Sequence, residues 1–138
     1  MERQYRVLIV DDNNDIRTTY QDYFTEQGFI VDVAPNGLEG LEKLREIEFD
    51  VALVDLEMPL MKGLEMLKIA REEGRDTETV ILSEHGNKDD AIAAIKMGVR
   101  DWFEKSSLEM SKLLDKVKEL AEGVPLDEIR RILSVIPD

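Results

Sequence analysis

Three carboxylates directly follow apolar runs, and their type and placement could support chemistry. Residues 7–10 run straight into Asp11 and Asp12, and residues 51–54 run straight into Asp55. An uninterrupted apolar run is typical of a strand that is buried on both faces, as in a parallel sheet covered by helices. In open α/β sheets, ligands meet the carboxyl ends of the strands. We therefore expect these acids to converge at one edge of a sheet.

Such a cluster favours a divalent cation and phosphorus chemistry. Carboxylates at close range raise one another's pKa unless a cation lies between them. Mg2+ prefers oxygen ligands, so it suits this set. A carboxylate beside Mg2+, here Asp55, can attack phosphorus and form an acyl phosphate. Without Asp55 close by, solvated loop acids or a helix N-cap would explain Asp11 and Asp12 equally well.

An acyl phosphate also needs a hydroxyl and a fixed cation for its remaining oxygens. Ser83 follows the apolar residues 80–82, and Lys105 comes shortly after Trp102 and Phe103. Both types are suitable, and both stand at predicted strand ends. Taken singly, such a serine is usually a cap and such a lysine is usually a surface residue.

The elements that position these residues alternate along the chain. Apolar side chains recur at helical spacing between the strand-like runs, and in residues 87–97 we expect Ile92 and Ile95 to face inward. Residues 30–34 are interrupted by Asp32, which indicates an edge strand. This alternation predicts an α/β fold, a doubly wound five-stranded parallel sheet in the order 2-1-3-4-5 with five flanking helices.

Composition and charge exclude several kinds of site and partner. The chain has 138 residues, a hydrophobic content of 43% and a formal charge of -13, with no cysteine and one histidine. Disulfides, thiolate metal sites and multi-histidine metal sites are excluded. The charge disfavours direct nucleic-acid binding and favours cations or a partner with a basic face. No apolar run is long enough to span a membrane and no signal peptide is recognisable, so we expect a cytoplasmic protein.

One motif carries a family resemblance. Four residues follow the spacing D-x-x-M-P-x-x-x-G, namely Asp55, Met58, Pro59 and Gly63. This spacing resembles the phosphoacceptor segment of response-regulator receiver domains in two-component signalling. Together with the acids, the serine and the lysine, the resemblance covers about residues 5–122. We expect a receiver domain at residues 1–122 and a helical extension at residues 123–138.

The resemblance implies a role for each site residue. Asp55 would be the phosphorylation site. Mg2+ would be held by Asp11, Asp12, Asp55 and the backbone carbonyl of Glu57. Ser83 would be the switch hydroxyl and Lys105 the phosphate-binding lysine, while Trp102 takes the place of the family's aromatic switch. The partners implied are a histidine kinase or phosphotransfer protein and a downstream protein or output domain. The chemistry would be limited to self-phosphorylation and slow autodephosphorylation.

The chain departs from the family pattern at three positions. Glu84 stands where the family usually has Ala or Gly, Ser106 where it usually has Pro, and Trp102 where it usually has Tyr or Phe. Glu84 would crowd or repel the incoming phosphoryl group, and the alternative for Trp102 is an ordinary partly exposed residue of an edge strand. His85, with Glu57, would set how fast water reaches the acyl phosphate, or it is an exposed loop histidine.

Two other functions share part of this pattern. A pseudo-receiver would bind partners without phosphorylation, and Glu84 favours it. A haloacid-dehalogenase-like phosphatase also uses an Asp nucleophile and Mg2+, but it needs D-x-D after its first strand. Here that strand is followed by Asp11-Asp12-Asn13-Asn14.

The C-terminal segment is predicted to be an extra helix. Pro125 suits its first position, and apolar residues recur at 3-4-3 spacing at Leu126, Ile129, Leu133 and Ile136. We expect it to be a packing or dimerisation helix, giving a possible homodimer, or a linker to an output domain. Docking back on its own domain is the alternative.

Overall fold

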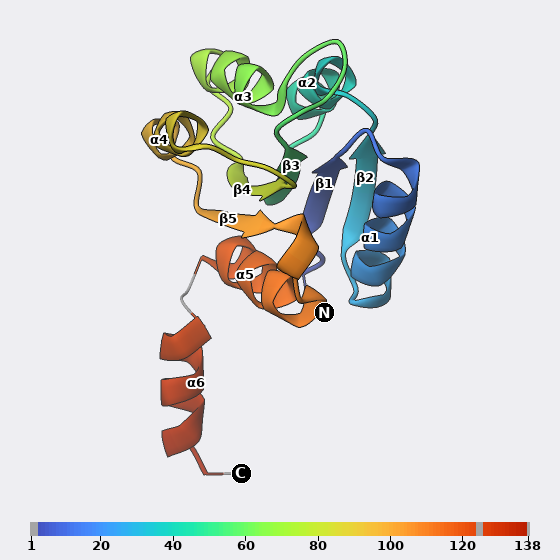
Figure 1. Ribbon diagram of the computed structural model, residues 1–138. Helices are drawn as coiled ribbons and strands as arrows, with labels where there is room; N and C mark the ends of the chain where they lie inside the picture. Colours follow the sequence, from blue (N-terminus) through green and yellow to red (C-terminus); the bar gives the residue numbers. More distant parts are fainter. Residues whose placement is uncertain (1–2, 124–125, 138) are drawn as a thin grey trace.

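Five strands pair in parallel in the order β2-β1-β3-β4-β5, as the sequence predicts (Figure 1). The computed structural model describes residues 3–123 and 126–137. The strands are β1 (Arg6–Val10), β2 (Ile30–Ala34), β3 (Val51–Asp55), β4 (Glu78–Ser83) and β5 (Asp101–Glu104). The helices are α1 (Asn14–Glu26), α2 (Gly37–Glu46), α3 (Gly63–Glu72), α4 (Lys88–Lys96), α5 (Met110–Glu122) and α6 (Leu126–Val135), with a 3-10 turn η1 (Lys105–Ser107).

Two layers of helices cover the sheet, which explains why its central strands are apolar throughout. Side chains point alternately to the two faces of a strand. In β1, Leu8 and Val10 pack with the buried residues of α2, α3 and α4. Val7 and Ile9 pack instead with those of α1 and α5. Figure 1 shows α1 and α5 on one side of the sheet and α2, α3 and α4 on the other.

Asparagines fix where three of the helices begin. Each accepts a hydrogen bond at its side-chain oxygen from a backbone N–H of the first turn, a standard N-cap. The caps are Asn13 to Ile16 at 3.1 Å, Asn36 to Glu39 at 2.8 Å and Asn87 to Asp90 at 2.8 Å. All three start helices at the edge of the sheet where the strands end, and Asn13 lies in the loop that carries Asp11 and Asp12.

The prediction that Ile92 and Ile95 of α4 face inward is wrong. They are 51% and 73% exposed, whereas Ala94 is 2% exposed and packs against the core. The helix has two parallel stripes at i, i+3 spacing, one of alanines and one of isoleucines. The small side chains of the alanine stripe let α4 approach the sheet closely, and the larger isoleucines remain at the surface.

The predicted C-terminal extension forms α6, which projects away from the sheet beyond α5 (Figure 1). Arg130 of α6 pairs with Asp115 of α5, Nη2 to Oδ2 at 3.4 Å. The predicted start at Pro125 lies outside the described residues. Within the described ranges, none of the helices combines the length and the apolar character needed to cross a bilayer.

Candidate functional site

Strand pairing brings the predicted site residues to one edge of the sheet. β1 pairs with β3, so the chain after Val10 emerges beside the end of β3, where Asp55 is the last residue. Ser83 is the last residue of β4 and lies in register with Glu104 of β5. Lys105 follows immediately. The backbone alone therefore places acid, hydroxyl and ammonium groups at neighbouring strand ends.

The three acids converge as predicted. One carboxylate oxygen from each of Asp11, Asp12 and Asp55 lies within 4.8 Å of the others. Asp11 and Asp55 are only 1% and 6% exposed, while Asp12 is exposed. Three hard oxygen donors at this separation, with one side open to solvent, suit Mg2+, which retains waters on part of its shell. The donor set therefore fits the expected cation.

Lys105 already supplies one positive charge to this cluster. Its Nζ lies 2.6 Å from Oδ2 of Asp11 and 3.4 Å from Oδ2 of Asp55, and its side chain is 8% exposed. Burial acts to lower the pKa of Lys105, but the hydrogen bond to Asp11 and the nearby carboxylates outweigh burial and raise it. Lys105 is therefore a fixed cation at physiological pH, which is what binding a phosphoryl oxygen requires.

Asp55 has a strongly perturbed pKa. Burial, and then the charge of Asp11, raise the pKa of Asp55 to about 7, although Lys105 acts in the opposite direction. A second cation would favour the charged carboxylate and lower this pKa. Perturbed carboxylates of this kind concentrate at functional sites.

A pocket of about 440 Å3 opens over Asp55. Ser83, which is 1% exposed, and Lys105 line it together with Asp55. The exposed side chains of Glu57, Glu84 and His85 stand around the same pocket. Glu57 also lies 3.8 Å from the ammonium of Lys62. The pocket thus has an acidic rim above the buried lysine.

Trp102 does not line this pocket. It is half-buried, packs against the core on the α2–α3–α4 side, and its indole ring lies directly over Gly86, where a Cβ atom would overlap the ring. The loop between β4 and α4 is therefore in contact with the position that the resemblance assigns to an aromatic switch. Ser106 lies in the 3-10 turn, and none of the described peptide bonds is cis.

Two further residues contact the backbone of the acids. Gly63, known from the sequence only as part of the D-x-x-M-P-x-x-x-G spacing, leaves no room for a side chain, because an added Cβ atom there would overlap the carbonyl oxygen of Asp55. Arg17 was not singled out, and its Nη1 donates to the carbonyl oxygen of Asp11 at 2.8 Å. Its place one turn after the N-cap Asn13 was the available clue. Its acceptor is a backbone atom, so residue types alone could not identify the contact.

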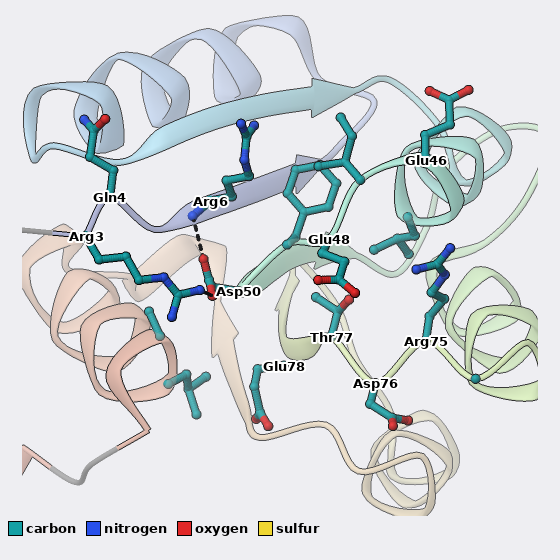
Figure 2. A pocket seen from close by; sticks show the side chains of 16 residues that line it. Arg3, Gln4, Arg6, Glu46, Glu48, Asp50, Arg75, Asp76, Thr77 and Glu78 are labelled. Atoms are coloured by element: carbon teal, nitrogen blue, oxygen red, sulfur yellow. Dashed lines mark hydrogen bonds and ion pairs between the residues drawn. The ribbon is translucent and has the colours of Figure 1, made fainter.

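A larger hollow, of about 980 Å3, lies at the amino ends of the strands. Figure 2 shows Asp50 at its centre, accepting a hydrogen bond from the backbone N–H of Arg6 at 2.8 Å. Asp50 also accepts one from Nη2 of Arg3 at 2.9 Å. These hydrogen bonds join the amino end of β1 to the residue that precedes β3. Five acidic and three basic side chains line the hollow.

Comparison with known proteins identifies a family for this chain. A family profile matches residues 7–118, and its description is "response regulator receiver domain". Chemotaxis protein CheY of Thermotoga maritima is 30% identical over 118 residues, covering 85% of this chain and 98% of that protein. The crystal structure of a CheY-like receiver domain protein from Methanospirillum hungatei is similar with a TM-score of 0.83 at 26% identity, covering 88% of this chain and 96% of that one.

Some relatives are longer than this chain. Protein-glutamate methylesterase/protein-glutamine glutaminase 1 of Methanospirillum hungatei is 38% identical over 104 residues, covering 72% of this chain. The match spans only 30% of that protein's length. By the family match over residues 7–118 and by its fold, this chain belongs to the response regulator receiver domain family.

Proposed function

We propose that this receiver accepts a phosphoryl group on Asp55 from a phosphohistidine of a separate histidine kinase or phosphotransfer protein in the cytoplasm. The observation that carries the proposal is the meeting of Asp11, Asp12 and Asp55 with the buried ammonium of Lys105. This arrangement supplies a nucleophile, oxygen ligands for a cation and a fixed positive charge at one point. The pocket above it leaves room for the donor to approach.

The proposed step is a transfer between two nucleophiles. A carboxylate oxygen of Asp55 attacks phosphorus, and the bond from phosphorus to the donor's imidazole nitrogen breaks as the new P–O bond forms. The donor phosphohistidine carries a proton on its other ring nitrogen, so when the electron pair of the broken bond stays on the first nitrogen the ring leaves as a neutral imidazole, and Asp55 holds a mixed anhydride. Lys105 and the hydroxyl of Ser83 bind two of the phosphoryl oxygens.

Mg2+ would be held by Asp11, Asp12, Asp55 and the backbone carbonyl of Glu57. When bound, it supplies positive charge opposite the phosphoryl oxygens. The chain's own contribution is to keep Asp55 buried and directed into the pocket. Because the pKa of Asp55 is raised to about 7, a second cation is what keeps this carboxylate in the charged, nucleophilic form at neutral pH.

Phosphorylation would act as a switch of protein binding. Ser83 and Lys105 would move toward the phosphoryl oxygens, and α4, β5 and α5 would shift between two arrangements. A groove of about 460 Å3 runs between α4 and β5 and is lined in part by Ala91, Ile95 and Trp102. With the exposed Ile92 beside it, this face is a suitable surface for a downstream protein or output domain.

The rim residues would set the lifetime of the phosphorylated state. His85, Glu57 and Glu84 are exposed and line the pocket through which water reaches Asp55. Glu84 lies next to Ser83, so its carboxylate also repels an approaching phosphoryl group. These residues would tune the rates of uptake and hydrolysis.

Intact-mass spectrometry tests the proposal. The protein is incubated with phosphoramidate, with Mg2+ or with a chelator, and its mass is measured after each incubation. We expect a gain of one phosphoryl group that needs Mg2+ and is absent in Asp55→Asn. Asp76→Asn, which changes an exposed carboxylate at the opposite edge of the sheet, is the matched control and should gain the same mass as the wild type.

A failure of phosphorylation at Asp55 would contradict the proposal. Absence of a mass gain in the wild type, or a gain that persists in Asp55→Asn, would favour a pseudo-receiver that binds partners without phosphorylation. In that case Glu84→Ala becomes the informative variant, because restored uptake would identify Glu84 as the cause.

A further inference from the structure

We propose that Arg17 is a positioning residue that holds the Asp11–Asp12 segment in place and thereby sets the affinity for Mg2+. The inference rests on the proposed Mg2+ site. Arg17 belongs to α1, and its hydrogen bonds go to the loop backbone and to Asn14. Its effect on the cation would therefore pass through the loop, by way of the backbone of Asp11.

The carbonyl of Asp11 needs a partner because the strand ends there. The register of β1 with β2 and with β3 stops at Val10. The N–H of Asp11 still donates to the carbonyl oxygen of Ala34, at 3.1 Å. The carbonyl oxygen of Asp11 accepts instead from Nη1 of Arg17, at 2.8 Å. An unpaired buried carbonyl costs free energy, and here the Arg17 side chain donates the hydrogen bond that a neighbouring strand would otherwise supply.

Arg17 also ties this strand end to the start of α1. Its Nη2 donates to Oδ1 of Asn14 at 3.1 Å, and its own backbone N–H donates to the carbonyl oxygen of Asn13 at 3.0 Å. The N–H of Asn13 donates in turn to Oδ1 of Asp11 at 2.9 Å. The exposed Asp12 therefore lies between two anchored points, and its carboxylate is directed by a backbone that these contacts hold.

The shape of the guanidinium matters as well as its charge. Arginine presents several N–H donors in a rigid planar fork, so one half-buried side chain reaches a backbone carbonyl and a side-chain amide together. Lysine at this position would keep the positive charge near the acids but has no planar fork. Charge and positioning can therefore be separated by substitution.

Isothermal titration calorimetry of Mg2+ into the full chain tests the inference. We expect Arg17→Lys and Arg17→Gln to weaken Mg2+ binding by about tenfold each, the lower end of what outer-shell partners of metal ligands contribute. Arg45→Gln, at an exposed arginine paired with Glu73, is the matched control and should bind as the wild type does. Urea unfolding without Mg2+ is measured for every variant.

Several outcomes would overturn the assignment. Wild-type affinity in Arg17→Lys would mean that the planar fork is not needed, and tighter Mg2+ binding in Arg17→Gln would mean that Arg17 acts only through the repulsion of its charge. Unchanged affinity in both, with or without lower stability, would reduce Arg17 to a structural residue. Should neither variant fold, Asn14→Ala provides the test, because it removes one hydrogen bond of the Arg17 guanidinium. This variant is expected to weaken Mg2+ binding about threefold. An unchanged affinity in Asn14→Ala would count against a positioning role. A wild type that binds no Mg2+ would remove the proposed metal site as well.

Discussion

Asp55 is close to the midpoint of its titration at neutral pH, because burial and Asp11 raise its pKa to about 7. A carboxylic acid that is half protonated is a poor nucleophile, so the bare site is less reactive than its geometry suggests. Lys105 alone offsets only part of the charge of the acids around it. Dependence on a divalent cation therefore follows from this one side chain.

The raised pKa predicts a pH dependence of stability in the absence of Mg2+. Between pH about 4 and about 7 the folded protein retains a proton on Asp55 that the unfolded chain has lost. The folded state binds more protons in this window, so this group's contribution to the free energy of unfolding falls as the pH rises. We expect Asp55→Asn to become progressively stabilising relative to the wild type, by on the order of 3 kcal/mol at pH 8.

Urea unfolding of both proteins from pH 4 to 8, in a chelator, measures this difference. Saturating Mg2+ should erase most of it, because the cation stabilises the charged carboxylate of the wild type. A difference that does not vary with pH would mean that Asp55 titrates as an ordinary exposed acid.

At the scale of elements, the loop from β3 to α3 is constrained by close contact. Gly63 begins α3, and its N–H donates to the carbonyl oxygen of Leu56 at 3.0 Å. A Cβ atom at Gly63 would overlap the carbonyl oxygen of Asp55 and lie 2.9 Å from Cγ1 of Val54. The glycine is needed here to leave room for the backbone of the proposed phosphoacceptor.

Gly63→Ala is therefore expected to destabilise the protein by about 2–4 kcal/mol, since backbone must shift to admit the methyl group. Gly74→Ala is the comparison. Gly74 has open space around it, and only its positive φ of 82° is strained by a side chain, which should cost about 1 kcal/mol. Urea unfolding midpoints of the two variants give the comparison. An equal or smaller loss for Gly63→Ala would contradict the close-contact explanation.

The elements differ in how far the sequence could predict them. β1 and β3 were predictable because strands buried on both faces must be apolar throughout, and the acids then follow from where those runs end. α4 was misjudged because two i, i+3 stripes are present and residue size alone favoured the isoleucines. The contact of Arg17 with a backbone carbonyl could not be predicted from residue types, because every residue offers a carbonyl.

At the scale of the whole molecule, α6 presents an apolar surface beyond the receiver. In α6, Ile132, Leu133 and Val135 are 41%, 63% and 74% exposed, and Ile136, directly after the helix, is 54% exposed. Arg130 engages Asp115 of α5, so a polar contact joins α6 to the receiver and leaves these side chains uncovered. Of the roles expected for this segment from the sequence, we propose dimerisation through these side chains, with packing on the domain and a linker to an output domain as the alternatives.

This proposal predicts concentration-dependent dimerisation, measured by analytical ultracentrifugation. Two short helices bury less area than a standard interface, so the mass should rise toward two chains only at high concentration. Leu133→Lys should restore the mass of one chain. Leu38→Lys, at a similarly exposed leucine on α2, is the control and should leave dimerisation unchanged. A mass of one chain at every concentration would exclude α6 as a dimerisation helix.

The proposed function requires that Asp55, its neighbouring acids, Ser83 and Lys105 all act on one phosphoryl group. A crystal structure with Mg2+ and beryllofluoride, an analogue of a phosphoryl group, tests this most directly. We predict beryllium bound to a carboxylate oxygen of Asp55, Mg2+ held by Asp11, Asp12 and Asp55, and fluorines contacting Ser83 and Lys105. Beryllofluoride on another residue, or Mg2+ bound away from these acids, would contradict the proposed site.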